Sequence, residues 1–137
     1  MSKYRKNPLP VPLPTPVTQP FWDATKEHRL LLQRCANGHT FYYARTHCPE
    51  CLSNEVAWVP ASGRGQLYSY TVARRPQSPE FAEDVPCIIA AITLEEGPRM
   101  TSLLVDADPD NVQIDGAVEV VWDDLDSVAM PYFRPGP

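Results

Sequence analysis

The sequence predicts a mainly β protein in which an extended N-terminal arm and a short helix lead into a small cysteine-based ribbon, followed by a small closed barrel. Three observations support this order. Prolines are concentrated in the first twenty residues, three of the four cysteines fall within residues 35–51, and short β-prone segments fill residues 55–137. Since 137 residues allow one ordinary domain plus a mini-domain, we divide the chain into residues 1–19, 20–54 and 55–137.

The composition is that of a globular protein with a real core. Apolar residues make up 43% of the chain, charged residues make up 21%, and the formal net charge is −5. This negative balance argues against nucleic-acid binding, which depends on clustered lysine and arginine. The sequence has neither an apolar run long enough for a membrane span nor a signal-peptide pattern. Cysteines at metal-ligand spacing fit a reducing compartment, so we expect a cytoplasmic protein.

The first nineteen residues form a proline-rich arm. A basic tip is followed by PLPVPLPTP, where proline at every second position disfavours helix and strand ladders and favours extended polyproline II. Two interpretations are open: a disordered arm, or an arm that lies along a partner protein. The apolar residues between the prolines favour the second, because a proline-rich segment loses little entropy on docking.

A short helix is expected after the arm, with Thr18 or Asp23 as its cap. Its apolar side is formed by Phe21, Trp22 and Leu30. The leucine-rich segment that follows predicts a short strand that leads to the first cysteine of the ribbon.

Four residues predict a metal site. Cys48 and Cys51 form a C-x-x-C knuckle, in which a tight turn brings both sulfurs to the same side. Cys35 and His39 can supply the other two ligands of a tetrahedral zinc site, where Zn–S is about 2.3 Å and Zn–N about 2.0–2.1 Å. So small a ribbon buries too little apolar surface to fold alone, so we expect the zinc to stabilise it. His47 is an alternative fourth ligand, and a ribbon that has lost its metal is a further alternative.

The remaining residues predict the barrel. Short β-prone segments separated by turn signals lie at residues 55–60, 66–72, 85–94, 99–105 and 117–122, and residues 130–135 are expected to close the chain as an edge segment. Residues 74–83 are expected to form a long surface loop, and Asp123, Asp124 and Asp126 a solvated turn. Several short strands at this spacing favour a small OB-like barrel.

With both parts in place, the sequence resembles the DUF35 family, described as acyl-CoA-associated OB-fold proteins with a rubredoxin-like zinc ribbon. The resemblance covers nearly the full length, and the matching segments occur in the family's order. They are Pro20-Phe21-Trp22-Asp23-Ala24, Leu31-Leu32-Gln33-Arg34-Cys35, Cys48-Pro49-Glu50-Cys51, Ser62-Gly63-Arg64-Gly65, Tyr68-Ser69-Tyr70-Thr71-Val72, Leu94-Glu95-Glu96-Gly97-Pro98-Arg99, Val118-Glu119-Val120-Val121 and Pro131-Tyr132-Phe133-Arg134-Pro135. One departure is that the family's first knuckle usually reads C-x-x-C, whereas Gly38 stands at the second cysteine position here and His39 follows it.

The resemblance implies a non-catalytic subunit of an acyl-CoA-processing complex. Family members typically bind thiolase-like partners (thiolases, acyltransferases or retro-aldolases), for example as hetero-oligomers with two copies of each chain, and the partner carries the catalytic groups. The small subunit helps to form the channel for the CoA portion of the substrate. In an acidic chain, candidate CoA contacts are Arg64, Arg74 and Arg75, with solvated surface arginines as the alternative. Phe21 and Trp22 are candidate partner contacts, unless they fold back on the ribbon or barrel.

Independent catalysis is not expected. Cys87, the one cysteine outside the cluster, lies in an apolar strand and is expected to be buried and inert. A zinc ion with four protein ligands has no open position for a substrate, and three thiolates with one histidine do not suit an electron-transfer iron site. The alternatives are a stand-alone OB-fold that binds single-stranded nucleic acid, with Tyr68 and Tyr70 stacking on bases, and an independent enzyme acting on acyl-CoA.

Overall fold

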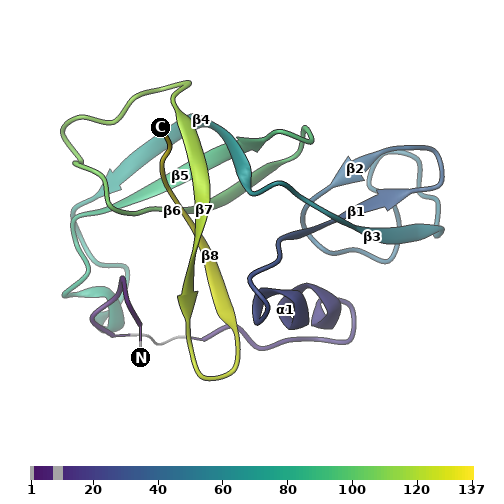
Figure 1. Ribbon diagram of the computed structural model, residues 1–137. Helices are drawn as coiled ribbons and strands as arrows, with labels where there is room; N and C mark the ends of the chain where they lie inside the picture. The colour runs from purple at the N-terminus through teal and green to yellow at the C-terminus, as the bar shows by residue number, and fades with distance from the viewer. Residues whose placement is uncertain (1, 8–10) are drawn as a thin grey trace.

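The computed structural model describes residues 2–7 and 11–137, and it places a three-stranded ribbon sheet beside a closed barrel, with a short helix packed below their connection (Figure 1). Residues 1 and 8–10 of the predicted arm lie outside the described residues. The elements are α1 (Gln19–Thr25), β1 (Leu31–Cys35), β2 (Thr40–Phe41), β3 (Val56–Pro60), β4 (Arg64–Ala73), the 3-10 helix η1 (Pro79–Phe81), β5 (Cys87–Leu94), β6 (Arg99–Leu104), β7 (Ala117–Asp124) and β8 (Ala129–Pro135). This mainly β architecture confirms the predicted fold class.

The ribbon sheet has the strand order β2-β1-β3, with both neighbours antiparallel to β1. β3, which the sequence grouped with the barrel, pairs with β1 along its whole length, from Leu31 opposite Pro60 to Cys35 opposite Val56. The sheet of the ribbon therefore extends past residue 54. The buried amide of Gln33 on β1 both donates to the Arg45 carbonyl (3.0 Å) and accepts from the Arg45 N–H (2.8 Å), which ties the connection before the second knuckle to this sheet.

α1 joins the ribbon to the barrel. Thr18 is its N-cap residue, but its side chain makes no capping bond, and Pro20 occupies the first turn, where a missing N–H costs nothing. The buried Thr25 hydroxyl donates to the Trp22 carbonyl (2.6 Å) and accepts from the Ala129 N–H (3.3 Å) at the start of β8. This second bond fixes the helix on the barrel. No helix among residues 2–7 and 11–137 has the length and apolar character needed to cross a bilayer.

The barrel closes in the order β4-β5-β6-β8-β7, with β7 paired back to β4. β8 was expected at an edge, and this expectation is wrong: it runs antiparallel to β7 and also pairs in parallel with β6, at Leu104 opposite Phe133. The Phe133 carbonyl accepts from the Val105 N–H (2.7 Å), so alternate residues Pro131 and Pro135 also face β6. Prolines that face β6 remove no N–H from the ladder toward β7. Little is lost toward β6 either, because the pairing between β6 and β8 is so short.

Glycine is required where β4 begins beside β7. Gly63 has a φ of +80°, and a Cβ there would lie 2.5 Å from Cγ1 of Val120. Its carbonyl accepts from the Val120 N–H at 2.7 Å. The chain therefore turns into the barrel at a point where no side chain fits. Further along β4, the register shifts between Leu67 and Ser69, a bulge of the kind that helps a strand curve.

One hydrophobic core runs through the barrel and reaches the helix and β1. Its buried members include Phe21 from α1 and Leu32 from β1, together with Leu67, Ile92 and Phe133 from the barrel. A second, smaller cluster lies in the ribbon and consists of Cys35, Phe41 and Cys48, with Cys51 and Val56 packed against it. β1 thus contributes to both clusters, and the ribbon's own apolar core is small.

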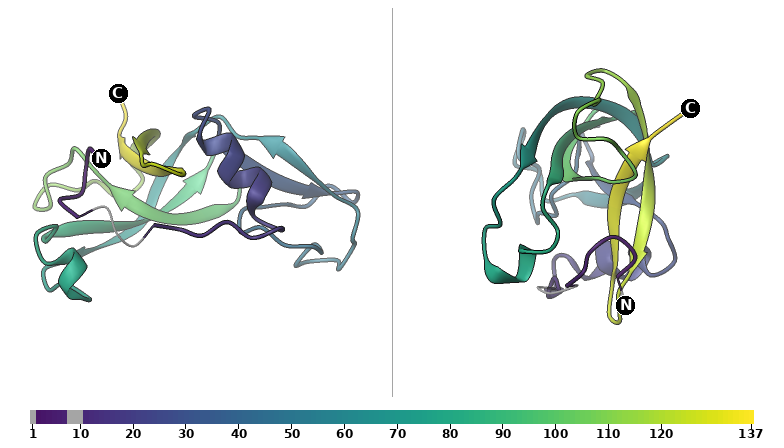
Figure 2. Two further views of the ribbon diagram at one scale, coloured as in Figure 1. Left: turned by 90° about the horizontal axis from the view of Figure 1, so that it is seen from below. Right: turned by 90° about the vertical axis from the view of Figure 1, so that its left-hand side faces the viewer.

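The N-terminal residues fold back onto the far end of the barrel, as two views agree (Figures 1 and 2). The Lys3 N–H donates to Asp123 (2.6 Å), and the Lys6 N–H donates to Asp84 (2.7 Å). Asp123 is 1% exposed, so the solvated turn predicted there is wrong for this residue. A buried carboxylate requires donors, and Ser2 and Lys3 supply them from a distant part of the chain.

The buried side chain of Tyr132 should make the free energy of unfolding fall at alkaline pH. Burial, and then the nearby Asp123, raise the pKa of Tyr132 to about 12, against about 10 in an unfolded chain. Its contribution is therefore complete below about pH 10 and is lost as the pH rises toward about 12. Urea unfolding at several pH values should show a shallower decline over this interval for Tyr132→Phe than for the native chain. Equal slopes would contradict this assignment.

Candidate metal centre and surrounding surfaces

The first knuckle is a tight turn at the end of β1. The Gly38 N–H donates to the Cys35 carbonyl (2.9 Å), and the Cys35 N–H donates to the His39 carbonyl (3.0 Å). Gly38 has a φ of +88°, which glycine adopts at little cost. This turn returns the imidazole of His39 to the side on which the Cys35 sulfur lies.

The second knuckle is also a tight turn, and it carries two cysteines. The Leu52 N–H donates to the Cys48 carbonyl (2.9 Å), and the Glu50 N–H points at the Cys48 sulfur (3.3 Å). Leu52 has a φ of +64°, an uncommon conformation for an apolar side chain. The turn closes Cys48 and Cys51 onto one side, where backbone N–H groups can stabilise thiolates.

The four candidate ligands meet at one point. Nδ1 of His39 lies 3.4 Å from Sγ of Cys35 and 3.6 Å from Sγ of Cys48, and the sulfurs of Cys35 and Cys51 are 3.7 Å apart. All four ligand atoms lie within 4.8 Å of one another. A tetrahedral zinc with ordinary bond lengths has edges of about 3.8 Å between sulfurs and about 3.6 Å between sulfur and nitrogen. The donor set and its spacing therefore fit one zinc ion.

The surroundings favour thiolate at the exposed side of the cluster. The Asn37 amide donates to Sγ of Cys51 (3.3 Å), and this bond is the largest cause that lowers the pKa of Cys51 to about 6. The thiolate is the form that binds metal. The bond to Cys51 in turn raises the pKa of His39, so protons compete with zinc for that imidazole as the pH falls. On its outer side, Nε2 of His39 lies 3.8 Å from a carboxylate oxygen of Glu50, which fits a histidine oriented by an acidic neighbour.

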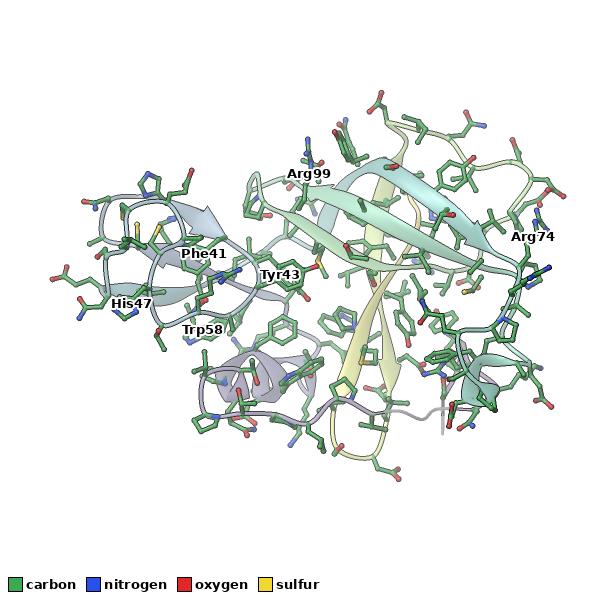
Figure 3. The ribbon with its side chains drawn as sticks, turned by 180° about the vertical axis from the view of Figure 1, so that it is seen from behind. Phe41, Tyr43, His47, Trp58, Arg74 and Arg99 are labelled. Atoms are coloured by element: carbon green, nitrogen blue, oxygen red, sulfur yellow. The ribbon has the colours of Figure 1, made fainter. Side chains whose placement is uncertain are left out.

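His47 lies outside this cluster. Its Nδ1 is 2.9 Å from the Thr46 hydroxyl, and the residue is exposed on an outer loop of the ribbon (Figure 3). The ligand atoms that the structure brings together are those of Cys35, His39, Cys48 and Cys51. With four protein ligands, such a site is closed and provides no position for a substrate.

The predicted CoA-contact arginines do not form one cluster. Arg64 begins β4 and pairs with Glu95 (3.2 Å), whereas Arg74 follows the end of β4 and pairs with Asp110 (3.5 Å). The length of β4 separates them by about 30 Å. Arg75 is exposed beside Arg74. A single phosphate group therefore cannot contact both ends of this set.

The predicted partner contacts differ from each other. Phe21 is 6% exposed and packs edge-on against Trp22 and Tyr42, with ring centroids at 4.9 Å and 5.7 Å. Phe21 therefore folds back on its own chain, which is the alternative to a partner contact. Trp22 is half-buried beside the same core.

An aromatic and cationic surface at the junction of ribbon and barrel was not predicted as a unit. The Tyr43 hydroxyl from the ribbon accepts from the Thr101 N–H on β6 (3.3 Å), and Arg99 lies over the Tyr68 ring at 3.5 Å (Figure 3). Tyr43 is 54% and Tyr68 50% exposed. The sequence placed Tyr68 in a strand, but only the fold brings Tyr43 and Arg99 to the same junction.

Two family descriptions match consecutive parts of this chain. Residues 22–57 match "ChsH2, rubredoxin-like zinc ribbon domain", and residues 58–123 match "ChsH2, C-terminal OB-fold domain". The zinc-ribbon match and the Cys/His cluster together support a structural zinc ion.

Similar proteins include both short and long chains. A "DUF35 domain-containing scaffold protein" of Methanocaldococcus jannaschii is 38% identical over 104 residues, which cover 74% of this chain and 73% of the relative. A "Probable enoyl-CoA hydratase alpha subunit" of Thermomonospora curvata is 39% identical over 118 residues, which cover 84% of this chain but only 36% of the relative. This chain therefore spans about a third of that hydratase subunit.

Two solved structures share the fold. A chain of "Ltp2-ChsH2(DUF35) aldolase" is 35% identical, with a TM-score of 0.80, and the match covers 91% of this chain and 98% of that one. A protein of unknown function from Sulfolobus solfataricus is 16% identical with a TM-score of 0.63, a likeness in fold alone.

Proposed function

Because the chain belongs to the DUF35 family, we propose that it is a non-catalytic, zinc-binding subunit of an acyl-CoA-processing complex. A thiolase-like chain carries the catalytic groups in this proposal, and its reaction is a thiolase, acyltransferase or retro-aldolase reaction. The observation that carries the proposal is the match to a chain of an aldolase at 35% identity over 98% of that chain. The names of two relatives, a scaffold protein and a hydratase alpha subunit, agree with a partner role in CoA chemistry.

The chemistry of the described residues supports a non-catalytic role. The four metal-binding groups are all protein ligands, so the zinc would be structural. Cys87 is half-buried, and burial raises the pKa of its thiol, which opposes a role as nucleophile. In this proposal, the role of the zinc is to hold the two knuckles together.

Exposed apolar residues on the ribbon and arm support a partner surface there. Leu52 is 74% exposed and also has a positive φ, so it bears two costs in the isolated chain. Leu13 on the arm is 86% exposed. Tyr43 and Tyr68 add aromatic surface of the kind that is enriched at protein interfaces. We assign the partner interface to the ribbon and the arm, with Trp22 at its margin.

The acyl-CoA channel is assigned to the boundary between this chain and its partner. Arg99 and Arg64 lie at the same end of the barrel, the end nearer the ribbon. Both are next to the end of β5, because Arg99 is opposite Thr93 and Gly65, which follows Arg64, is opposite Leu94. Guanidinium groups beside exposed tyrosines suit the phosphates and adenine of CoA. Arg74 and Arg75 lie at the other end and would meet a different part of the ligand.

Single-stranded nucleic acid is the alternative ligand of an OB fold, and two observations oppose it. Its usual site is the face of the second and third barrel strands with the loop between the first two, which here are β5, β6 and residues 74–86. The N-terminal segment lies on this side and bonds to Asp84 in that loop. The chain also carries a net charge of −5.

Co-expression with a thiolase-like protein from the same genome tests the proposal. We expect a stable hetero-oligomer on size-exclusion chromatography at micromolar concentration. Leu52→Glu places a charge on the ribbon surface and should weaken the complex at least tenfold, whereas Ile114→Glu, at a 52% exposed apolar site on the barrel, should not. Elution of the native proteins as separate peaks would refute the proposal.

A further inference from the structure

A cavity of about 720 Å³ lies under the N-terminal segment. Its walls come from residues 4–5 and 11–12 of that segment, the loop before β5, the sheet of β5 and β6, and the start of β8, with Trp22 and Tyr42 at one end. Figure 2 shows the described parts of this segment, residues 2–7 and 11–18, on this side of the molecule. Its volume is in the range of ligand-binding pockets, about 300–1,000 Å³.

The cavity exists because the barrel has a short seam. β6 and β8 pair only at Leu104 and Phe133, so the rest of that edge of β6 is left beside the cavity. All residues from 100 to 107 line it without interruption. The strand residues 100–104 alone extend about 13 Å, which makes the cavity long rather than round.

The two ends of the cavity differ in chemistry. At the start of β6, where the Thr101 N–H reaches Tyr43, its wall includes residues Trp22, Tyr42 and Met100. The middle is lined by Leu103 and Met130. This part offers aliphatic and aromatic contacts to a ligand.

Polar groups gather at the other end, where Leu104 on β6 lies opposite Ile88, close in sequence to Asp84. Nε of Arg5 lies 3.1 Å from Asp84, and both side chains are less than a tenth exposed. Arg5 also interacts with the side chain of Tyr132, which lines the cavity too. A guanidinium, a carboxylate and a phenol thus meet at one end of an apolar groove.

We propose that this cavity binds a medium-length acyl chain, with its polar head at Arg5, Asp84 and Tyr132 and its alkyl tail along β6 toward Trp22. Apolar burial along the groove supplies the affinity, and the buried polar end fixes the orientation. This site is contained within one chain and needs no partner. It therefore stands or fails independently of the proposed complex.

Titration of decanoate and of 1-decanol into the zinc-loaded chain, by calorimetry and below the concentration at which the probes aggregate, tests this site. We expect saturable one-to-one binding. Leu103→Glu puts a charge in the apolar wall and should weaken binding at least tenfold, whereas Ile114→Glu, at an exposed apolar residue outside the cavity, should change it less than twofold. If decanoate binds more tightly than decanol, the polar head of the ligand lies at the guanidinium of Arg5. If decanol binds more tightly, the head lies at the phenol of Tyr132 and the carboxylate of Asp84.

A second measurement uses the native chain, so it does not depend on the folding of a variant. With ¹³C-methyl methionine labelling, the signals of Met100 and Met130 should both shift on adding decanoate, because both residues line the cavity. Failure of the native chain to bind either probe below millimolar concentration would overturn the proposal. So would binding that leaves both methyl signals in place.

Discussion

Replacing Cys48 by serine is expected to remove the zinc and to unfold both knuckles. Cys48 is fully buried at the centre of the small ribbon cluster, which contains only two other buried residues, Cys35 and Phe41. Structural zinc contributes about 10–16 kcal/mol of apparent binding free energy in small zinc-dependent folds, far more than a cluster of this size supplies. Elemental analysis should give one zinc per native chain and close to none for Cys48→Ser, and amide signals of residues 35–55 should lose their dispersion.

Matched substitutions make this result specific. Cys87→Ser applies the same change outside the cluster and should keep one zinc per chain. His39→Ala should lower zinc affinity while His47→Ala leaves it unchanged, because only His39 lies beside the sulfurs. A Cys48→Ser protein with full zinc content would contradict the assignment of the site, and unchanged affinity in His39→Ala would remove that residue from it.

Local spacing is what made the metal cluster predictable. A C-x-x-C turn fixes two sulfurs within a few residues, and a glycine before His39 permits the turn that returns the imidazole. The strands of the barrel were predictable for a similar reason, because alternation and turn residues are local signals. β5 and β6 accordingly begin or end within two residues of the segments predicted for them.

Long-range pairing could not be predicted in the same way. Nothing in the sequence of β3 indicates that it pairs with β1 instead of a barrel strand, since both kinds of neighbour accept an apolar β segment. β8 contains two prolines and so resembled an edge strand, but both prolines face the short seam with β6. Asp123 looked solvated because the residues that satisfy it, Ser2 and Lys3, lie about 120 positions earlier in the chain.

Replacing Phe133 by alanine is expected to have the largest effect of any single substitution on the barrel. The side chain is fully buried on β8, between Leu104 on β6 and Val120 on β7. Removing a phenyl ring from such a site costs about 3–5 kcal/mol, because the surrounding strands collapse only partly into the space. Urea unfolding of the zinc-loaded chain should show this loss directly, and Ile114→Ala at an exposed site should change stability by less than about 0.5 kcal/mol.

The same experiment shows how far the barrel core extends. Phe21 and Leu32 belong to one cluster with Phe133, so α1 and the base of β1 should lose stability together with the barrel. The knuckles have their own cluster and their metal, and they should keep zinc until the barrel unfolds. We therefore expect fluorescence and circular dichroism to report one coincident transition for Phe133→Ala, shifted to lower urea. A separate earlier transition of α1 would show that the helix is not held by the barrel core, contrary to the bond between Thr25 and Ala129.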